Sequence, residues 1–197
     1  MKIWFPLAAA VVLTACSETP VAKTPVKPPE PLTGRQAFYQ TYPQARTWAQ
    51  DAQPVRVRSL ELDELKADGG KAAAWEVLYA SQAKGRSRVY SWSAVEAQGN
   101  LHKGVFANQE ESWHAGGSDK PFLIQALKID TPEALETAIA HSGTYFKNAG
   151  TKPHPKFVLE YSERYPDPVW RIYWGDSVST AEWSVFVDAA TGNYQGR

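Results

Sequence analysis

Cysteine is nearly absent from this chain of 197 residues, because Cys16 is the only one. A single cysteine excludes an intramolecular disulfide, so a packed core must stabilise the fold. An excess of charge of either sign is also absent, since 21 basic side chains balance 21 acidic ones. This balance argues against nucleic acid or an anionic lipid surface as the main partner.

Long hydrophobic runs are missing as well. An apolar stretch at the N-terminus reaches from Ile3 to Val12, contains Pro6 and follows Lys2. It is too short to span a bilayer as a mature helix. Together with the motif Leu13-Thr14-Ala15-Cys16, it resembles the signal peptide and lipobox of bacterial lipoproteins.

The lipoprotein resemblance implies a location and an anchor. Residues 1–15 would be removed as a signal peptide, and Cys16 would carry several acyl chains, palmitate among them, which together hold a protein firmly on a membrane. Ser17 stands where Asp would otherwise follow the cysteine, which by resemblance implies the outer membrane, with the protein facing the periplasm. The alternative is an ordinary secretory signal with an incidental cysteine.

Proline is concentrated after this cysteine. Residues 16–34 contain five prolines and favour extended polyproline-like conformations, so we expect a tether that reaches up to roughly 50 Å from the bilayer. A proline-rich recognition motif is the alternative. The folded part is then expected in two units, residues 35–120 and 121–197.

Periodicity in residues 35–120 predicts one helix and several strands. The helical pattern covers residues 33–53, and the helix start is placed near Thr41, after a short preceding turn of helix, where Thr41 to Gln44 has the form of a capping box with Pro43 in the first turn. Strands are expected over residues 55–62, with a bulge at Ser59, over 73–80 and over 88–96, followed by a short edge strand through Val105 and Phe106. Residues 107–120 are expected to be a connection.

Residues 121–197 show a similar order. Residues 122–129 are read as a strand or a buried lead-in, and Asp130 starts a helix that ends at Gly143 or Gly150. This helix is expected to turn Ala134, Leu135, Ala138 and Ile139 inward, and Tyr145 as well if it extends that far. Strands are expected over residues 157–161, 168–174 and 182–188. The fold class is therefore α+β, built from two helix-plus-antiparallel-sheet units.

The two units echo each other. Trp75-x-Val77-x-Tyr79, Trp92-Ser93 and Gly99-Asn100 resemble Trp170-x-Ile172-x-Trp174, Trp183-Ser184 and Gly192-Asn193. Internal duplication and two unrelated hairpins are both compatible with this pattern. The stretch from Pro168 to Trp174, followed by Val185-Phe-Val-Asp-Ala-Ala-Thr-Gly192, resembles a PepSY unit. That resemblance implies a non-catalytic module with binding or inhibitory roles, and a tandem PepSY-like duplication if both halves belong to it.

No catalytic or metal-binding pattern is found. His102, His114, His141 and His154 lack the spacing of zinc ligands, and no nucleophile elbow or phosphate-binding glycine motif occurs. Asp188 and Thr191 are expected to bond turn amides. We therefore expect no enzyme activity, no cofactor and no metal.

A binding surface remains as the candidate site. If Trp170, Ile172, Trp174, Val185 and Val187 pack beneath the helices, Arg171, Tyr173 and Phe186 lie on the opposite face, a mixture enriched at interfaces. The alternative is that this face covers the sheet of the other half. The leading hypothesis is an outer-membrane-anchored module that binds or inhibits an envelope protein. An aromatic-lined site for a glycan or hydrophobic ligand is the second hypothesis, and an unrecognised hydrolase is the third.

Overall fold

The protein is described by a computed structural model that covers residues 29–117, 119–148 and 154–197. The lipobox and most of the expected tether lie outside these described residues. The fold is α+β, as predicted. Its described elements are β1 (Leu32–Thr33), α1 (Gly34–Trp48), β2 (Gln53–Leu60), β3 (Lys71–Ala72), β4 (Ala74–Ser81), β5 (Arg86–Ser93), β6 (Gly104–Ser112), the 3₁₀ helix η1 (Ile124–Ala126), α2 (Thr131–Ala140), α3 (Gly143–Asn148), β7 (Lys156–Glu160), β8 (Val169–Trp174), β9 (Trp183–Asp188) and β10 (Tyr194–Gly196).

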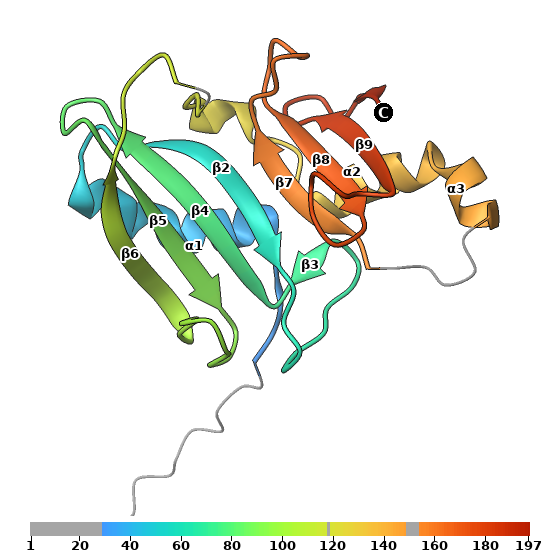
Figure 1. Ribbon diagram of the computed structural model, residues 1–197, viewed down its shortest axis with the longest axis horizontal. Helices are drawn as coiled ribbons and strands as arrows, with labels where there is room; N and C mark the ends of the chain where they lie inside the picture. Colours follow the sequence, from blue (N-terminus) through green and yellow to red (C-terminus); the bar gives the residue numbers. More distant parts are fainter. Residues whose placement is uncertain (1–28, 118, 149–153) are drawn as a thin grey trace, which may run out of the picture.

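The two halves of the chain share one antiparallel sheet. Its strand order is β10-β9-β8-β7-β2-β4-β5-β6, so each half is a meander and the halves join through β2 and β7. Helices α1 and α2 lie on the same side of this sheet (Figure 1). One cluster of buried side chains, which includes Val77 and Ile172, runs beneath both helices. The predicted units therefore lie edge to edge on one continuous core.

Helix α1 begins earlier than predicted. Thr33 is its N-cap and forms a capping box with Gln36, whereas Thr41 lies inside the helix and is buried. The Thr41 hydroxyl bonds the Phe38 carbonyl at 3.0 Å, so it does not cap a helix start. Pro43 is accommodated within the helix. Its missing amide would have bonded the carbonyl of Tyr39, which belongs to an exposed residue that water can reach.

Helix α2 begins as predicted and ends sooner. Asp130 is the N-cap and forms a capping box with Glu133, but the helix stops at Ala140, before Gly143, which starts the separate helix α3. Ala134, Leu135 and Ala138 are buried as expected. The prediction that Ile139 faces inward is wrong, because 47% of this residue is exposed. The preceding segment forms η1 in place of the expected strand, although Phe122 is buried as a lead-in would be.

The strand predictions hold with three corrections. Strands β4, β7, β8 and β9 lie within one residue of the predicted ranges, and Val55 and Val57 point inward with Arg56 and Arg58 outward. Strand β5 ends at Ser93, three residues before its predicted end. The irregularity in β2 lies between Pro54 and Arg56, so the bulge predicted at Ser59 is wrong. Strand β6 extends to Ser112, so residues 107–112 are strand and not part of a connection.

The second and third strands of the two halves have matching registers. Trp75 pairs with Trp92, and Trp170 pairs with Val187, so both pairs enclose the same length of chain. Trp92 therefore corresponds to Val187 and not to Trp183. The Ala94 amide bonds the Ala73 carbonyl, just as the Ala189 amide bonds the Pro168 carbonyl.

The turn after each third strand is also shared. Ser93 Oγ accepts a bond from the Val95 amide at 3.3 Å, and Asp188 Oδ1 accepts one from the Ala190 amide at 2.8 Å. Ser93 is thus the counterpart of Asp188. The Gln98-Gly99-Asn100 turn, which the sequence comparison matches with the turn at Gly192-Asn193, lies further along the chain than Ser93. The turn role predicted for Asp188 is confirmed.

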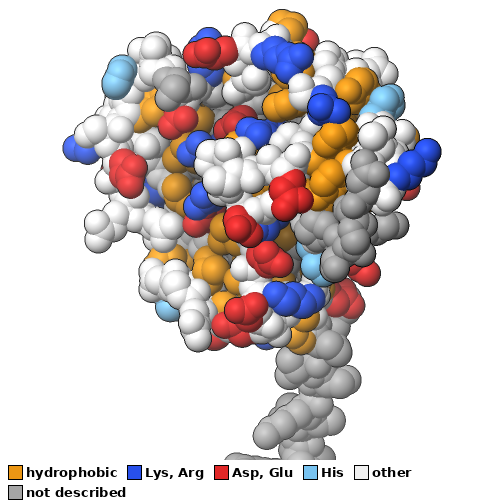
Figure 2. All heavy atoms as spheres, turned by 45° about the vertical axis from the view of Figure 1, so that its right-hand side comes forward, with side chains coloured by type: hydrophobic (Ala, Val, Ile, Leu, Met, Phe, Trp, Pro, Cys, Tyr) orange, Lys and Arg blue, Asp and Glu red, His pale blue; other side chains and the backbone are white. Residues whose placement is uncertain are grey.

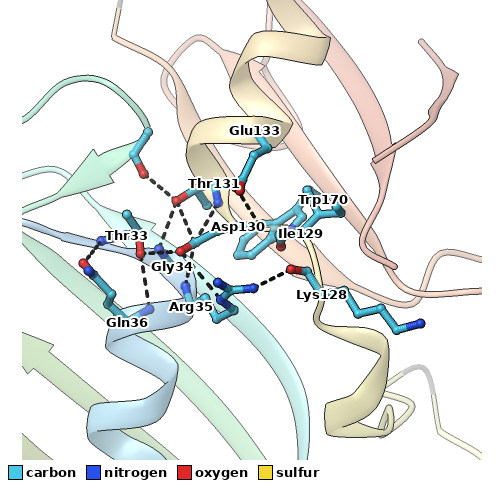
Figure 3. A network of polar contacts seen from close by, with 11 residues as sticks. Thr33, Gly34, Arg35, Gln36, Lys128, Ile129, Asp130, Thr131, Glu133 and Trp170 are labelled. Atoms are coloured by element: carbon cyan, nitrogen blue, oxygen red, sulfur yellow. Dashed lines mark hydrogen bonds and ion pairs between the residues drawn. The ribbon is translucent and has the colours of Figure 1, made fainter. Parts of the chain in front are cut away.

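The helix starts meet between the two halves (Figure 3). Asp130 caps α2, and its Oδ2 also accepts a bond from Thr33 Oγ1 at 2.6 Å while its Oδ1 accepts one from the Arg35 amide at 2.9 Å. The Gly34 amide donates to Thr131 Oγ1 at 3.0 Å. One buried carboxylate therefore caps both helices, where their N-terminal partial charges favour an anion.

Two tryptophans complete this junction symmetrically. The Trp75 indole donates to the Leu32 carbonyl, and the Trp170 indole donates to the Ile129 carbonyl, each at 2.9 Å. Leu32 and Ile129 are the residues just before the two N-caps, so each tryptophan fixes the entry of its own helix. Both rings are fully buried. The junction is internally satisfied and serves to hold the halves together.

Candidate functional site

The predicted binding residues lie on the face of the sheet opposite the helices. Trp170, Ile172, Trp174, Val185 and Val187 are buried on the helix side, as predicted. Residues Arg171, Tyr173 and Phe186 project to the other side, where Arg171 and Phe186 are directly opposite each other on β8 and β9. The alternative that this face covers the sheet of the other half is wrong, because the halves join edge to edge.

Two loops cover much of this predicted face. The ring of Tyr165, before β8, lies 5.3 Å from that of Phe186, and Arg171 donates to the Val178 carbonyl in the β8–β9 loop at 2.7 Å. Tyr173 is only 7% exposed, and burial raises the pKa of its hydroxyl. Binding by Arg171, Tyr173 and Phe186 stays a prediction. Because Tyr173 is buried, it would support the positions of Arg171 and Phe186 and would not contact a ligand directly.

Charges on the rest of this face are matched in pairs. Arg58 pairs with Glu76 on the neighbouring strand, and Arg56 lies 3.8 Å from Glu160 and 3.9 Å from Asp119. Burial raises the pKa of Glu160, and the nearby guanidinium of Arg56 opposes that rise. Acidic and basic side chains alternate across the surface with apolar ones between them (Figure 2). The face therefore presents no single sign of charge to a ligand.

Strand β6 is an open edge of the sheet. Its nine residues pair only with β5, and the side chains from Gln109 to Ser112 are exposed. A strand at a sheet edge leaves backbone N–H and C=O groups unpaired, and these can accept a further strand. The opposite edge strand, β10, has only three residues. The longer edge is the stronger candidate for contact with another chain.

A hollow lies beside this edge, on the helix side. It is lined by Gln44, Thr47, Trp48, Arg88, Tyr90 and Ala107. The Trp48 indole donates to Glu110 Oε1 of β6 at 2.7 Å, and the Arg88 Nε donates to the Asn108 carbonyl at 2.6 Å. Both bonds use the irregular part of the β5–β6 pairing, between the Arg88–Glu110 and Tyr90–Ala107 pairs. Such irregularities redirect side chains next to functional sites.

The walls of the hollow combine rings and cations. The Arg88 guanidinium lies 5.6 Å from the centre of the Tyr90 ring, and the Lys84 ammonium lies 5.8 Å from the Trp48 ring. Burial raises the pKa of the Tyr90 hydroxyl. The hollow is shallow and open, and its two aromatic rings beside fixed polar groups are of the kinds found at binding surfaces.

Potential metal ligands in the described residues do not gather into a site. Within residues 29–117, 119–148 and 154–197, no three His, Cys, Asp or Glu side chains gather so that they could hold a metal ion. His102 contacts Glu96 and Asn100 on the surface, and the Trp113 indole donates to the Asp119 carbonyl. In the part of the chain that is described, no helix is long and apolar enough to cross a membrane.

The fold thus defines an α+β protein with one helix-covered sheet face and one long open edge. Comparison with family models, curated proteins and solved structures finds no match to this chain.

Sequence reasoning predicted only the first part of β6, through Val105 and Phe106, and missed its second part and the hollow for an identifiable reason. Residues 108–112 read Asn-Gln-Glu-Glu-Ser and lack the apolar alternation that predicts a strand. The one available signal was position, because a polar stretch after three strands of a meander can form a fourth strand at the edge. Trp48 gave no signal of its own, since its partner Glu110 is distant in sequence.

Proposed function

We propose that this protein is a lipid-anchored module of the bacterial cell envelope, held on the outer membrane through Cys16, that binds another envelope protein without catalysing a reaction. The order of charge, apolar run and lipobox in residues 1–16 supports the anchor. The open edge of β6 carries the binding proposal, because an exposed strand of this length can pair with an extended segment of a partner.

The anchor is tested by changing the lipidated residue. Cys16→Ser in the full chain is expected to release the protein from membranes into the periplasmic fraction, and globomycin is expected to block processing of the unchanged chain. A Cys16→Ser protein that stays with the outer membrane after high-salt washing would contradict lipid anchoring.

The binding surface is tested by photocrosslinking in cells. A benzophenone amino acid at Gln109, on the open edge, is expected to crosslink to one envelope protein. The same group at Tyr39, which is 53% exposed on α1, is the matched control. Equal crosslinking at both positions, or none at Gln109, would contradict binding through β6. An inhibitor role would appear as lower activity of the captured partner in the presence of the purified protein.

A second function is favoured by the hollow at Trp48. Its ring and the polar groups around it suit a sugar ring, so the module would bind glycan strands of the envelope. Titration with soluble peptidoglycan fragments is then expected to change the fluorescence of the unchanged protein and not that of Trp48→Phe. An identical response from both proteins would count against a glycan at this place.

A further inference from the structure

We infer that the hollow beside β6 receives an aromatic side chain from the bound protein. This inference rests on the proposed function, since it names what the partner of the β6 edge brings with it. Its basis is a comparison of the two halves of the chain, in which the corresponding place is open in one half and filled in the other.

The two places correspond by position in the fold. Trp48 lies 15 residues after the N-cap Thr33, and Tyr145 lies 15 residues after the N-cap Asp130. On the sheet beneath them, Arg88 pairs with Tyr79 on β4, and Trp183 pairs with Trp174 on β8. Counted from the N-caps and from the strand pairs, Trp48 corresponds to Tyr145 of the second half, and Arg88 corresponds to Trp183.

In the second half this place is filled by stacked rings. Tyr145 of α3 stacks on Trp183 with ring centres 5.4 Å apart and planes 17° apart, and the Arg197 guanidinium lies 4.0 Å from the Trp183 ring. The Tyr145 hydroxyl donates to Glu182 at 3.1 Å. Tyr145 follows a break in the helical chain, since α2 ends at Ala140 and α3 begins at Gly143.

In the first half the corresponding groups are held apart. Helix α1 continues unbroken to Trp48, whose indole is bonded to Glu110 on β6, while Arg88 is bonded to the Asn108 carbonyl and lies against Tyr90. The hollow lies between these groups. A flat ring placed there would contact the lining side chains of Trp48, Arg88 and Tyr90, much as the Trp183 ring contacts both Tyr145 and Arg197.

The occupant is therefore an aromatic side chain, and tyrosine fits best. Stacked and edge-on aromatic pairs and a guanidinium over a ring each add stability beyond the area they bury. A tyrosine hydroxyl at the rim can bond the Gln44 amide or the exposed carboxylate of Glu110, as Tyr145 bonds Glu182. A strand added to β6 passes beside the hollow, so alternate side chains of such a strand face it.

Two short peptides test this inference on the full lipidated chain in detergent micelles. Acetyl-Val-Ser-Tyr-Ser-Val-amide is expected to shift the indole ¹H–¹⁵N resonance of Trp48 and to bind at least tenfold more tightly than the same peptide with leucine in place of tyrosine. Thr47→Trp, a change at an exposed position on the rim, is expected to fill the hollow and abolish the shift. Trp48→Ala is expected to weaken binding, and Tyr39→Ala is the control that leaves it unchanged.

The outcomes separate this inference from the proposed function. Equal binding of the tyrosine and leucine peptides, or binding that persists in Thr47→Trp, overturns the aromatic occupant. A shift of the Trp48 resonance by chitotriose alone overturns it in favour of a sugar. If Thr47→Trp and Trp48→Ala both leave crosslinking from Gln109 unchanged, the proposal of binding through the β6 edge still holds, and the proposal of an aromatic occupant is contradicted. If a benzophenone group at Gln109 gives no crosslink while Thr47 and Trp48 are unchanged, the result contradicts the proposed function itself.

Discussion

Gly34 lies where two buried tryptophans approach the start of α1. A Cβ atom there would lie 2.6 Å from Trp170 Cη2, 2.9 Å from Thr131 Cγ2 and 3.2 Å from Trp75 Cη2. The first two contacts are shorter than Cβ atoms show, the third is tight, and all three neighbours are buried. A residue with any side chain at this position therefore forces the junction apart.

Gly34→Ala is expected to lower the free energy of unfolding by about 1–3 kcal/mol, the usual cost of overpacking a core. Urea denaturation followed by circular dichroism measures this loss. Gly143→Ala is the matched control, because a Cβ atom at Gly143 would meet no atom within 4 Å. If both variants lost the same free energy of unfolding, the result would contradict close packing of Trp170, Thr131 and Trp75 around Gly34.

Glu160 gives the fold a dependence on pH. Burial raises the pKa of its carboxyl in the folded protein above the ordinary value. The folded state then binds this proton more tightly than the unfolded state, so the contribution of Glu160 to stability falls as pH rises from the ordinary value to the raised one. Glu160→Gln is expected to remove that decline, so its stability relative to the unchanged protein improves across this interval.

Denaturation curves at several pH values between about 4 and 7 check this expectation, because ordinary carboxyl groups titrate near the lower limit. Glu111→Gln, at an exposed position on β6, controls for the loss of one negative charge. A relative stability of Glu160→Gln that worsens as pH rises would reverse the sign argued for this group.

At the scale of elements, the N-cap of α1 does two jobs. The Thr33 hydroxyl accepts a bond from the Gln36 amide and donates one to Asp130. Thr33→Ala is expected to cost about 1–3 kcal/mol, because it removes a helix cap and leaves a buried carboxylate with one donor fewer. Thr47→Ala, at an exposed position of the same helix, is the control and is expected to change stability by less than about 0.5 kcal/mol.

If Thr33→Ala destabilised only α1, this result would contradict a cap shared by both helices. Amide hydrogen exchange distinguishes the two cases, since loss of a bond to Asp130 should also weaken protection in the first turn of α2. Protection that changes only in α1 after Thr33→Ala would mean that the two helix starts are capped independently.

Elements with strong local signals were predictable. Helix α2 starts where Asp130, Pro132 and Glu133 predict it, and β8 and β9 follow the alternation of apolar residues. The start of α1 was misplaced because Pro43 outweighed the capping pair of Thr33 and Gln36. That proline is tolerated because packing of Phe38 and Ala45 against the sheet holds the helix across the missing bond.

At the scale of the molecule, the join between β2 and β7 could not be predicted. Arg58 and Val158 are direct partners across it, and nothing local in either strand specifies a partner so distant in sequence. The α+β class followed from local periodicity, whereas the edge-to-edge arrangement depends on that pairing and on the contacts of Asp130. The second part of β6 and its hollow were also not predicted, because residues 108–112 lack the alternation of a strand and Trp48 is distant in sequence from its partner Glu110.

The shared sheet and core predict that the two halves unfold together. Ile172→Ala, in the second half, is expected to cost about 2–5 kcal/mol. Amides of β4 in the first half and β8 in the second half should then lose protection against hydrogen exchange by similar amounts, since global unfolding exposes both. Protection lost in β8 alone would show that the halves unfold independently.

The position of β1 has a mechanical consequence. The described chain enters the fold at Leu32 and Thr33, beside the central join, while β6 lies at one end of the eight-stranded sheet. Three strands, β2, β4 and β5, lie between that join and β6, so β6 lies roughly 15–20 Å from the join at the usual spacing of strands. A protein held by its N-terminal chain is thus attached near the middle of its sheet, and rotation about that attachment moves β6 through a wider arc than β2, β4 and β5, which increases the volume in which β6 can meet a partner.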